Sequence, residues 1–92
     1  MISMPVTDKQ IRDAIAGLLK SRLPPATICP SEAARALEPD EWRLLMPQVR
    51  AVAIIMAKSG VLDIRQRGKT MSPDKPLRGP IRLGRKTMGS DC

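Results

Sequence analysis

The sequence predicts an α+β domain in which three helices precede a small antiparallel β-hairpin. The first observation is that apolar residues before Gly60 recur three and four positions apart, which is the spacing of one buried helix face. The second is that apolar and polar residues alternate after Gly60, which is the spacing of a half-buried strand. The chain has 92 residues, enough for one domain, and its elements place that domain at residues 7–84.

The first helix is predicted to begin after Thr7. Thr7 and Gln10 have the spacing of a capping box, and Val6 and Ile11 have that of a hydrophobic staple. Its apolar stripe consists of Ile11, Ala14, Ile15, Leu18 and Leu19. Pro24 ends the helix, because a proline disfavours the helical conformation in the residue before it.

Two further helices follow. The second is short and begins near Pro30, since proline suits the first helical position, and Pro39 closes it. The third opens at residues 40–41 and is interrupted at Pro47, which restarts it as a first-turn residue. Gly60 is a natural left-handed stop for this helix.

The last third of the domain is predicted to form the hairpin. A strand covers residues 61–66, and its apolar side chains share one face. Gly68 is placed for a tight hairpin tip, so a returning strand starts near Thr70. A short edge strand follows at residues 81–83.

Three helices followed by a basic hairpin is the arrangement of a winged helix. The third helix would then be the recognition helix, and residues 61–83 would be the wing. Residues 1–6 are expected to form an N-terminal arm, and residues 85–92 a disordered basic tail.

Composition and charge exclude several functions. The chain has no histidine, the commonest general base and metal ligand, so we expect no enzymatic activity, no cofactor and no metal. Trp42 is the single aromatic residue, which excludes a stacking platform for bases. Cys29 is expected to be a reduced structural thiol, with redox sensing as the alternative. The sequence shows no signal-peptide pattern and no apolar run long enough to span a membrane. We therefore expect a cytoplasmic protein without membrane contact.

Four motifs in a fixed order resemble a known family. They are TICPSEAARAL at residues 27–37, WRLLMPQVR at 42–50, QRGK at 66–69 and GPIRL at 79–83. Over residues 8–84 the chain resembles a bacterial family of small proteins classed as a domain of unknown function, number 3253. The resemblance implies a winged-helix-like fold. It implies no activity and assigns no role to any residue, because the family has no established function.

The strongest functional signal is the positive charge of the last third. The net charge is +7, and residues 58–92 contribute nine basic and three acidic side chains. The predicted phosphate contacts are Arg65, Arg67, Lys69, Arg78 and Arg82. Arg65, Arg67 and Lys69 alternate and would share one face of an ideal strand. Gln48 and Arg50 are the only base-edge candidates on the third helix, so we expect low sequence specificity, with duplex DNA as the first partner to test.

Two other interpretations compete with nucleic-acid binding. Residues 51–57 carry no side-chain hydrogen-bond donor, so Ile54 and Ile55 could leave an apolar patch for a second copy or another protein partner. Trp42 either closes the core or acts as an anchor for that partner. In the third interpretation the positive charge only keeps a small protein soluble.

Overall fold

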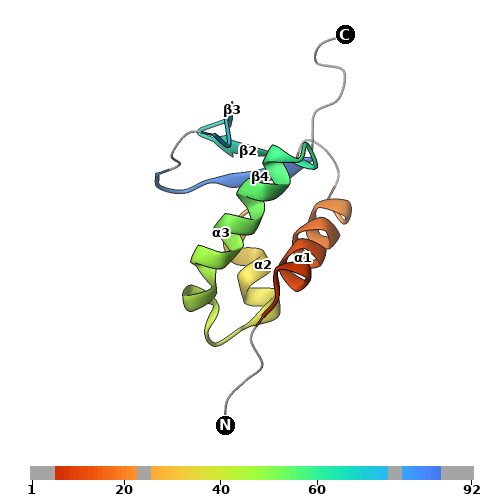
Figure 1. The fold of residues 1–92 in the computed structure, drawn as a ribbon, viewed down its shortest axis with the longest axis vertical. Helices are drawn as coiled ribbons and strands as arrows, with labels where there is room; N and C mark the ends of the chain where they lie inside the picture. Colours follow the sequence, from red (N-terminus) through yellow and green to blue (C-terminus); the bar gives the residue numbers. More distant parts are fainter. Residues whose placement is uncertain (1–5, 23–25, 75–77, 86–92) are drawn as a thin grey trace.

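The computed structural model describes residues 6–22, 26–74 and 78–85, which form three helices and four strands (Figure 1). Most of the predicted arm and tail therefore lies outside the described residues. The elements, in chain order, are α1 (Asp8–Lys20), β1 (Thr27–Ile28), α2 (Pro30–Leu37), α3 (Trp42–Lys58), β2 (Leu62–Gln66), β3 (Lys69–Met71) and β4 (Arg82–Arg85). The predicted α+β class is confirmed.

The capping box predicted for α1 is confirmed. The Thr7 hydroxyl accepts a hydrogen bond from the Gln10 backbone N–H at 3.2 Å, and the Gln10 side-chain oxygen accepts one from the Thr7 N–H at 2.8 Å. These bonds satisfy two of the backbone donors that a helix start leaves without partners. Ile11, Ile15 and Leu19 form the buried face of the helix, as the apolar stripe predicts.

The predicted interruption of the third helix at Pro47 is wrong. α3 is continuous from Trp42 to Lys58 and contains Pro47 in its second turn. Proline removes one helical hydrogen bond, to the carbonyl of the residue four positions earlier. Pro47 lies on the exposed side of α3, where water can satisfy that carbonyl. The cost is small enough for the buried face of α3 to keep the helix intact.

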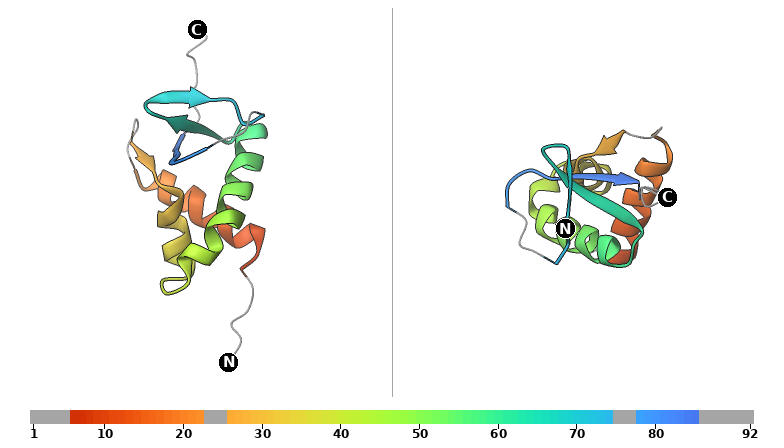
Figure 2. Two further views of the ribbon diagram at one scale, coloured as in Figure 1. Left: turned by 90° about the vertical axis from the view of Figure 1, so that its left-hand side faces the viewer. Right: turned by 90° about the horizontal axis from the view of Figure 1, so that it is seen from above.

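The described strands form one antiparallel sheet in the order β1-β4-β2-β3 (Figures 1 and 2). The β2–β3 hairpin is confirmed: Gln66 pairs with Lys69, and Arg67 and Gly68 form a two-residue turn with φ angles of 53° and 80°. Positive φ at both central residues is the signature of a type I′ turn. β1 was not predicted, because two residues carry no periodic signal and their partner strand lies far away in sequence.

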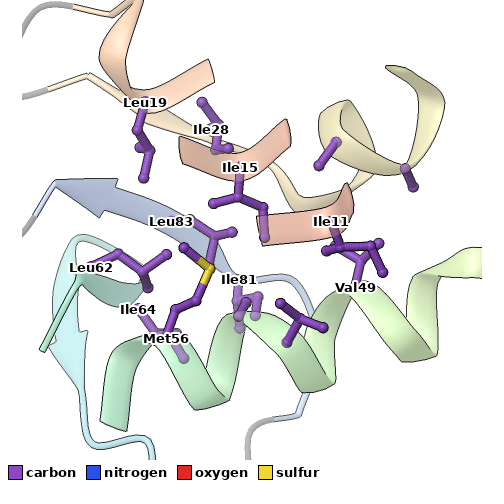
Figure 3. Close-up of a cluster of buried hydrophobic side chains, with 14 of the residues drawn as sticks. Ile11, Ile15, Leu19, Ile28, Val49, Met56, Leu62, Ile64, Ile81 and Leu83 are labelled. Carbon is purple, nitrogen blue, oxygen red and sulfur yellow. The ribbon is translucent and has the colours of Figure 1, made fainter. Parts of the chain in front are cut away.

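One face of the sheet packs on the helices and completes the core (Figure 3). The predicted edge position of the last strand is wrong, because β4 is central to the sheet: Leu83 pairs with Ile28 on one side and Ile64 on the other. All three side chains are almost completely buried. The sheet lies at one end of α3, and the α2–α3 turn lies at the other (Figure 2). This arrangement leaves the β2–β3 hairpin projecting away from the helices.

An ion pair between Arg22 and Glu32 joins the end of α1 to the start of α2. The Arg22 Nη2 atom lies 2.5 Å from Glu32 Oε1, and the Cys29 backbone N–H donates to Glu32 Oε2 at 2.9 Å. The hydrogen bond from Arg22 holds the pKa of Glu32 below its usual range, and the Cys29 N–H acts in the same direction, while burial opposes both.

The lowered Glu32 pKa predicts a loss of stability in acid. The pair stabilises the folded state at neutral pH, and this contribution is lost as the pH falls from about 4 through the folded-state pKa. Glu32→Gln is therefore expected to lower the free energy of unfolding at pH 7 and to have a smaller effect at pH 3. Urea unfolding of both proteins at the two pH values measures this difference. An equal effect at both values would contradict it.

Candidate functional site

A groove of about 630 Å³ lies between the tip of the β2–β3 hairpin and the segment that leads into β4. Its described lining residues are Gln66, Arg67, Lys69, Met71, Arg78, Gly79, Pro80 and Arg82. Four of these lining residues are cationic and none is acidic. A concave surface of one charge sign concentrates counter-ions, so the groove favours anions.

Gln66 sets the shape of this groove. Its Nε2 atom donates hydrogen bonds to the backbone carbonyls of Arg78 and Pro80, the second at 3.2 Å. These bonds hold the segment before β4 against the hairpin. Gly79 adopts a φ of 78°, a conformation that glycine enters without strain, and this bends the segment around the Gln66 amide. The groove therefore rests on hydrogen bonds and a backbone turn as well as on charge.

The four cationic side chains of the groove differ in whether they already bind another described residue. Arg67, Lys69 and Arg78 are exposed, and none of their side chains forms an ion pair or hydrogen bond with another described residue. The Arg82 guanidinium instead donates to the Thr27 hydroxyl at 2.9 Å and to the Thr27 carbonyl at 3.0 Å. Arg82 thus lines the groove while fastening β4 to β1. Three cations remain available for an anionic ligand.

Arg65 does not line the groove, and the predicted shared face of Arg65, Arg67 and Lys69 is wrong. Alternation places side chains on one face only within a single strand. The chain reverses at Arg67 and Gly68, so Lys69 pairs with Gln66 and shares its face, which is opposite to that of Arg65. The Arg65 side chain is only 19% exposed and lies 3.9 Å from the buried carboxylate of Asp63.

Arg65 is also packed tightly against β4. A Cβ atom added at Gly84 would lie 3.0 Å from Arg65 Cζ, so the absence of a side chain at Gly84 makes room for the guanidinium. Arg65 therefore supports the sheet, where it compensates the charge of a buried carboxylate.

This role gives a prediction that separates stability from binding. Arg65→Ala is expected to lower the free energy of unfolding by about 1–2 kcal/mol, because a buried carboxylate loses a charged neighbour. The same substitution at exposed Arg67 is expected to change it by less than about 0.5 kcal/mol. Urea unfolding measures both values, and equal values would contradict the assignment of Arg65 to the sheet.

Gln48 and Arg50, the two base-edge candidates, are both engaged within the protein. Gln48 Nε2 donates to the Val6 carbonyl and to the Asp8 carboxylate, each at 3.0 Å, which ties α3 to the start of α1. Arg50 Nη1 donates to the Gly79 carbonyl at 3.1 Å and holds the groove segment on α3. These contacts leave α3 with less capacity to read bases than the sequence suggests.

The apolar residues of α3 are only partly exposed. Ile54 is half-buried against the core, whereas Ile55 is 52% exposed, so Ile55 contributes more to the exposed apolar surface of α3. Leu44 is 77% exposed, and the sequence-based prediction of the apolar patch did not include it. It lies eleven residues, or three helical turns, before Ile55, and this spacing indicates that the two residues share a side of α3. Trp42 packs half-buried against the core, with Arg35 and Arg43 over its ring.

Cys29 serves the start of α2. Its side chain is half-buried, and its sulfur accepts a hydrogen bond from the Ser31 hydroxyl at 3.0 Å. Among the residues described, no group of three or more histidine, cysteine, aspartate or glutamate residues is placed to hold a metal ion. No helix in the described part of the chain is both long and apolar enough to cross a membrane.

The family of the chain is decided by sequence. Residues 8–86 match the family described as Protein of unknown function (DUF3253). The chain belongs to this family. No curated protein matches the chain. Because the DUF3253 description assigns no function, the case for a function rests on the groove and its neighbouring surfaces.

Proposed function

We propose that this DUF3253 protein is a non-enzymatic, cytoplasmic, winged-helix-like module that binds the phosphodiester backbone of nucleic acids with low sequence specificity. The observation that carries the proposal is the groove at the hairpin, where three exposed cations have no partner among the described residues. The order of the elements supports the comparison with a winged helix, with residues 61–83 as its wing.

In this proposal the wing binds and α3 does not read bases. Arg67, Lys69 and Arg78 contact phosphate oxygens, while Met71 and Pro80 supply apolar surface against the sugars. Phosphate contacts release condensed counterions, so the affinity falls as salt rises and depends little on sequence. The engagement of Gln48 and Arg50 supports this low specificity.

Fluorescence anisotropy of labelled nucleic acid across a salt series tests the proposal. We expect the logarithm of the binding constant for duplex DNA to fall linearly with that of the salt concentration, with a slope of about −3 or steeper for three phosphate contacts. The same titrations with single-stranded DNA and duplex RNA show which form of nucleic acid the protein binds most tightly. An absence of binding to all three forms at low salt would contradict the proposal.

The exposed side of α3 supports a second candidate function, self-association. Leu44 and Ile55 lie three turns apart on the same side of this helix, and both are more than half exposed. Sedimentation equilibrium tests this function. A dimer that Ile55→Asp converts to a folded monomer would support it, and a monomer at high concentration would contradict it.

A further inference from the structure

We infer that Arg35 and Arg43, held over the ring of Trp42, form a second phosphate-binding site, and that one nucleic-acid backbone runs from this site along α3 to the groove. This inference rests on the proposed function and extends it to the opposite end of α3. We call Arg35, Trp42 and Arg43 the arginine–tryptophan cluster.

The cluster holds two guanidinium groups in place without neutralising them. The Cζ atoms of Arg35 and Arg43 lie 4.3 and 4.7 Å from the centroid of the Trp42 ring, which places the two cations within about 9 Å of each other. Trp42 packs against the core, so its ring is a fixed support. Stacking on a ring orders each guanidinium while leaving its N–H edge available to bind a phosphate in a bidentate manner.

Neither guanidinium has another partner in the described part of the chain. Arg35 and Arg43 are exposed, and neither side chain forms an ion pair or hydrogen bond with a described residue. This holds even though the α2–α3 turn beside them carries the acidic residues Glu38, Asp40 and Glu41. Two like charges within about 9 Å of each other repel, and a phosphate bound to either guanidinium reduces that repulsion.

The cluster and the groove lie along the same side of α3. Arg43 and Arg50 are seven residues apart, which is two helical turns, so they share a side of the helix. Arg50 donates to the carbonyl of Gly79, which lines the groove. Figure 1 shows α3 running from the α2–α3 turn to the sheet. The side of α3 marked by Arg43 and Arg50 therefore leads from the cluster to the wing.

The spacing fits a phosphodiester chain. Arg43 and Arg50 are separated by about 10 Å along the helix axis. A nucleic-acid strand advances by about 3.4 Å per nucleotide, so this distance corresponds to about three nucleotides. A backbone that passes along this side would meet cations at both ends of its path. It would also leave the exposed apolar residues Leu44 and Ile55 outside the contact.

Trp42 provides a fluorescence signal that is specific to the arginine–tryptophan cluster. It is the only tryptophan, and the chain has no tyrosine or phenylalanine, so intrinsic fluorescence reports on this ring alone. We expect unlabelled duplex DNA to change the Trp42 emission, with the same midpoint that anisotropy of labelled duplex DNA gives. Poly-glutamate at the same salt concentration is the control for an acidic protein partner, and we expect it to have no comparable effect.

Two double variants assign the contacts. Arg35→Gln with Arg43→Gln is expected to lower the affinity for duplex DNA about 60-fold at 0.1 M salt and to reduce the magnitude of the salt slope by about 2. Arg12→Gln with Lys20→Gln removes the same charge from exposed positions of α1 and is expected to leave the slope unchanged. Circular dichroism confirms that each variant is folded.

The outcomes separate this inference from the proposed function. Wild-type binding without a change in Trp42 emission, and with unchanged affinity in the Arg35/Arg43 variant, would overturn the cluster and leave the groove in place. Loss of affinity in that variant with full affinity after substitution of Arg67 and Lys69 would overturn the groove and the continuous path. An equal response to poly-glutamate would overturn the phosphodiester assignment, and no binding to any nucleic acid would overturn both proposals.

Discussion

Replacing Arg67 and Lys69 with alanine is expected to lower the affinity for duplex DNA about 60-fold at 0.1 M salt. Each phosphate contact contributes about −0.9 to the salt slope, which corresponds to about eightfold in affinity per contact at this concentration. Both side chains line the groove, are exposed, and have no partner among the described residues, so they are available to the ligand. Fluorescence anisotropy across a salt series measures the affinity and the slope together.

The salt slope and the response to sequence distinguish this effect from a loss of folding. The magnitude of the slope should decrease by about 2, and the affinity should fall equally for duplexes of different sequence, because phosphates carry no sequence information. Arg12→Ala with Lys20→Ala, which removes two positive charges from exposed positions of α1, is the matched control for lost charge. An unchanged slope in the double variant would remove the wing from the binding site.

The largest expected effect on stability is that of Leu83→Ala. Leu83 is completely buried in the central strand β4, between Ile28 and Ile64 of the neighbouring strands. Shortening a buried leucine to alanine removes apolar burial and leaves a cavity, at a cost of about 2–5 kcal/mol. A domain of this size is stable by only about 5–15 kcal/mol, so the melting temperature should fall by at least about 10 °C. Thermal and urea unfolding, followed by circular dichroism, measure this change.

Leu44→Ala is the matched control for this prediction. The substitution is chemically identical, but Leu44 is 77% exposed on α3 and should change the free energy of unfolding by less than about 0.5 kcal/mol. Similar costs at the two positions would contradict the packing of β4 at the centre of the sheet.

Much of the fold could be predicted because it depends on neighbouring residues. The cap at Thr7, the start at Pro30 and the stop at Gly60 act within one helical turn of each helix end, so they can be recognised in the sequence. The two-residue turn at Gly68 is equally local. β1 could not be predicted, since its existence depends on pairing with β4, which follows it by more than fifty residues.

The candidate site was predicted in part for the same reason. Arg67, Lys69, Arg78 and Arg82 do line one groove, because a hairpin tip and its flanking segment expose their charged side chains. The hydrogen bonds that engage Gln48 and Arg50 reach across 40 and 29 residues of sequence, respectively, and no local pattern indicates them.

The prediction that Arg65 contacts the ligand beside Arg67 and Lys69 is not supported, for a different reason. The alternation of Arg65, Arg67 and Lys69 spans a turn that reverses the chain, so it does not place the three side chains on one face. Gly84, which makes room for Arg65, lies on another strand. Local chemistry therefore identifies which residues are basic and exposed. Tertiary pairing decides which of them remain free.

The measurement that tests the central claim most directly is a nuclear magnetic resonance titration of the labelled protein with a short DNA duplex. The account predicts that the largest shift changes occur at the backbone amides of the hairpin tip and the facing segment, Arg67, Gly68, Lys69 and Gly79. Amides of Ala51 and Ile55, on the exposed side of α3, should change little. Shift changes confined to Leu44, Ala51 and Ile55 would contradict the account, because they would place the nucleic acid on the apolar side of α3 and leave the wing unoccupied.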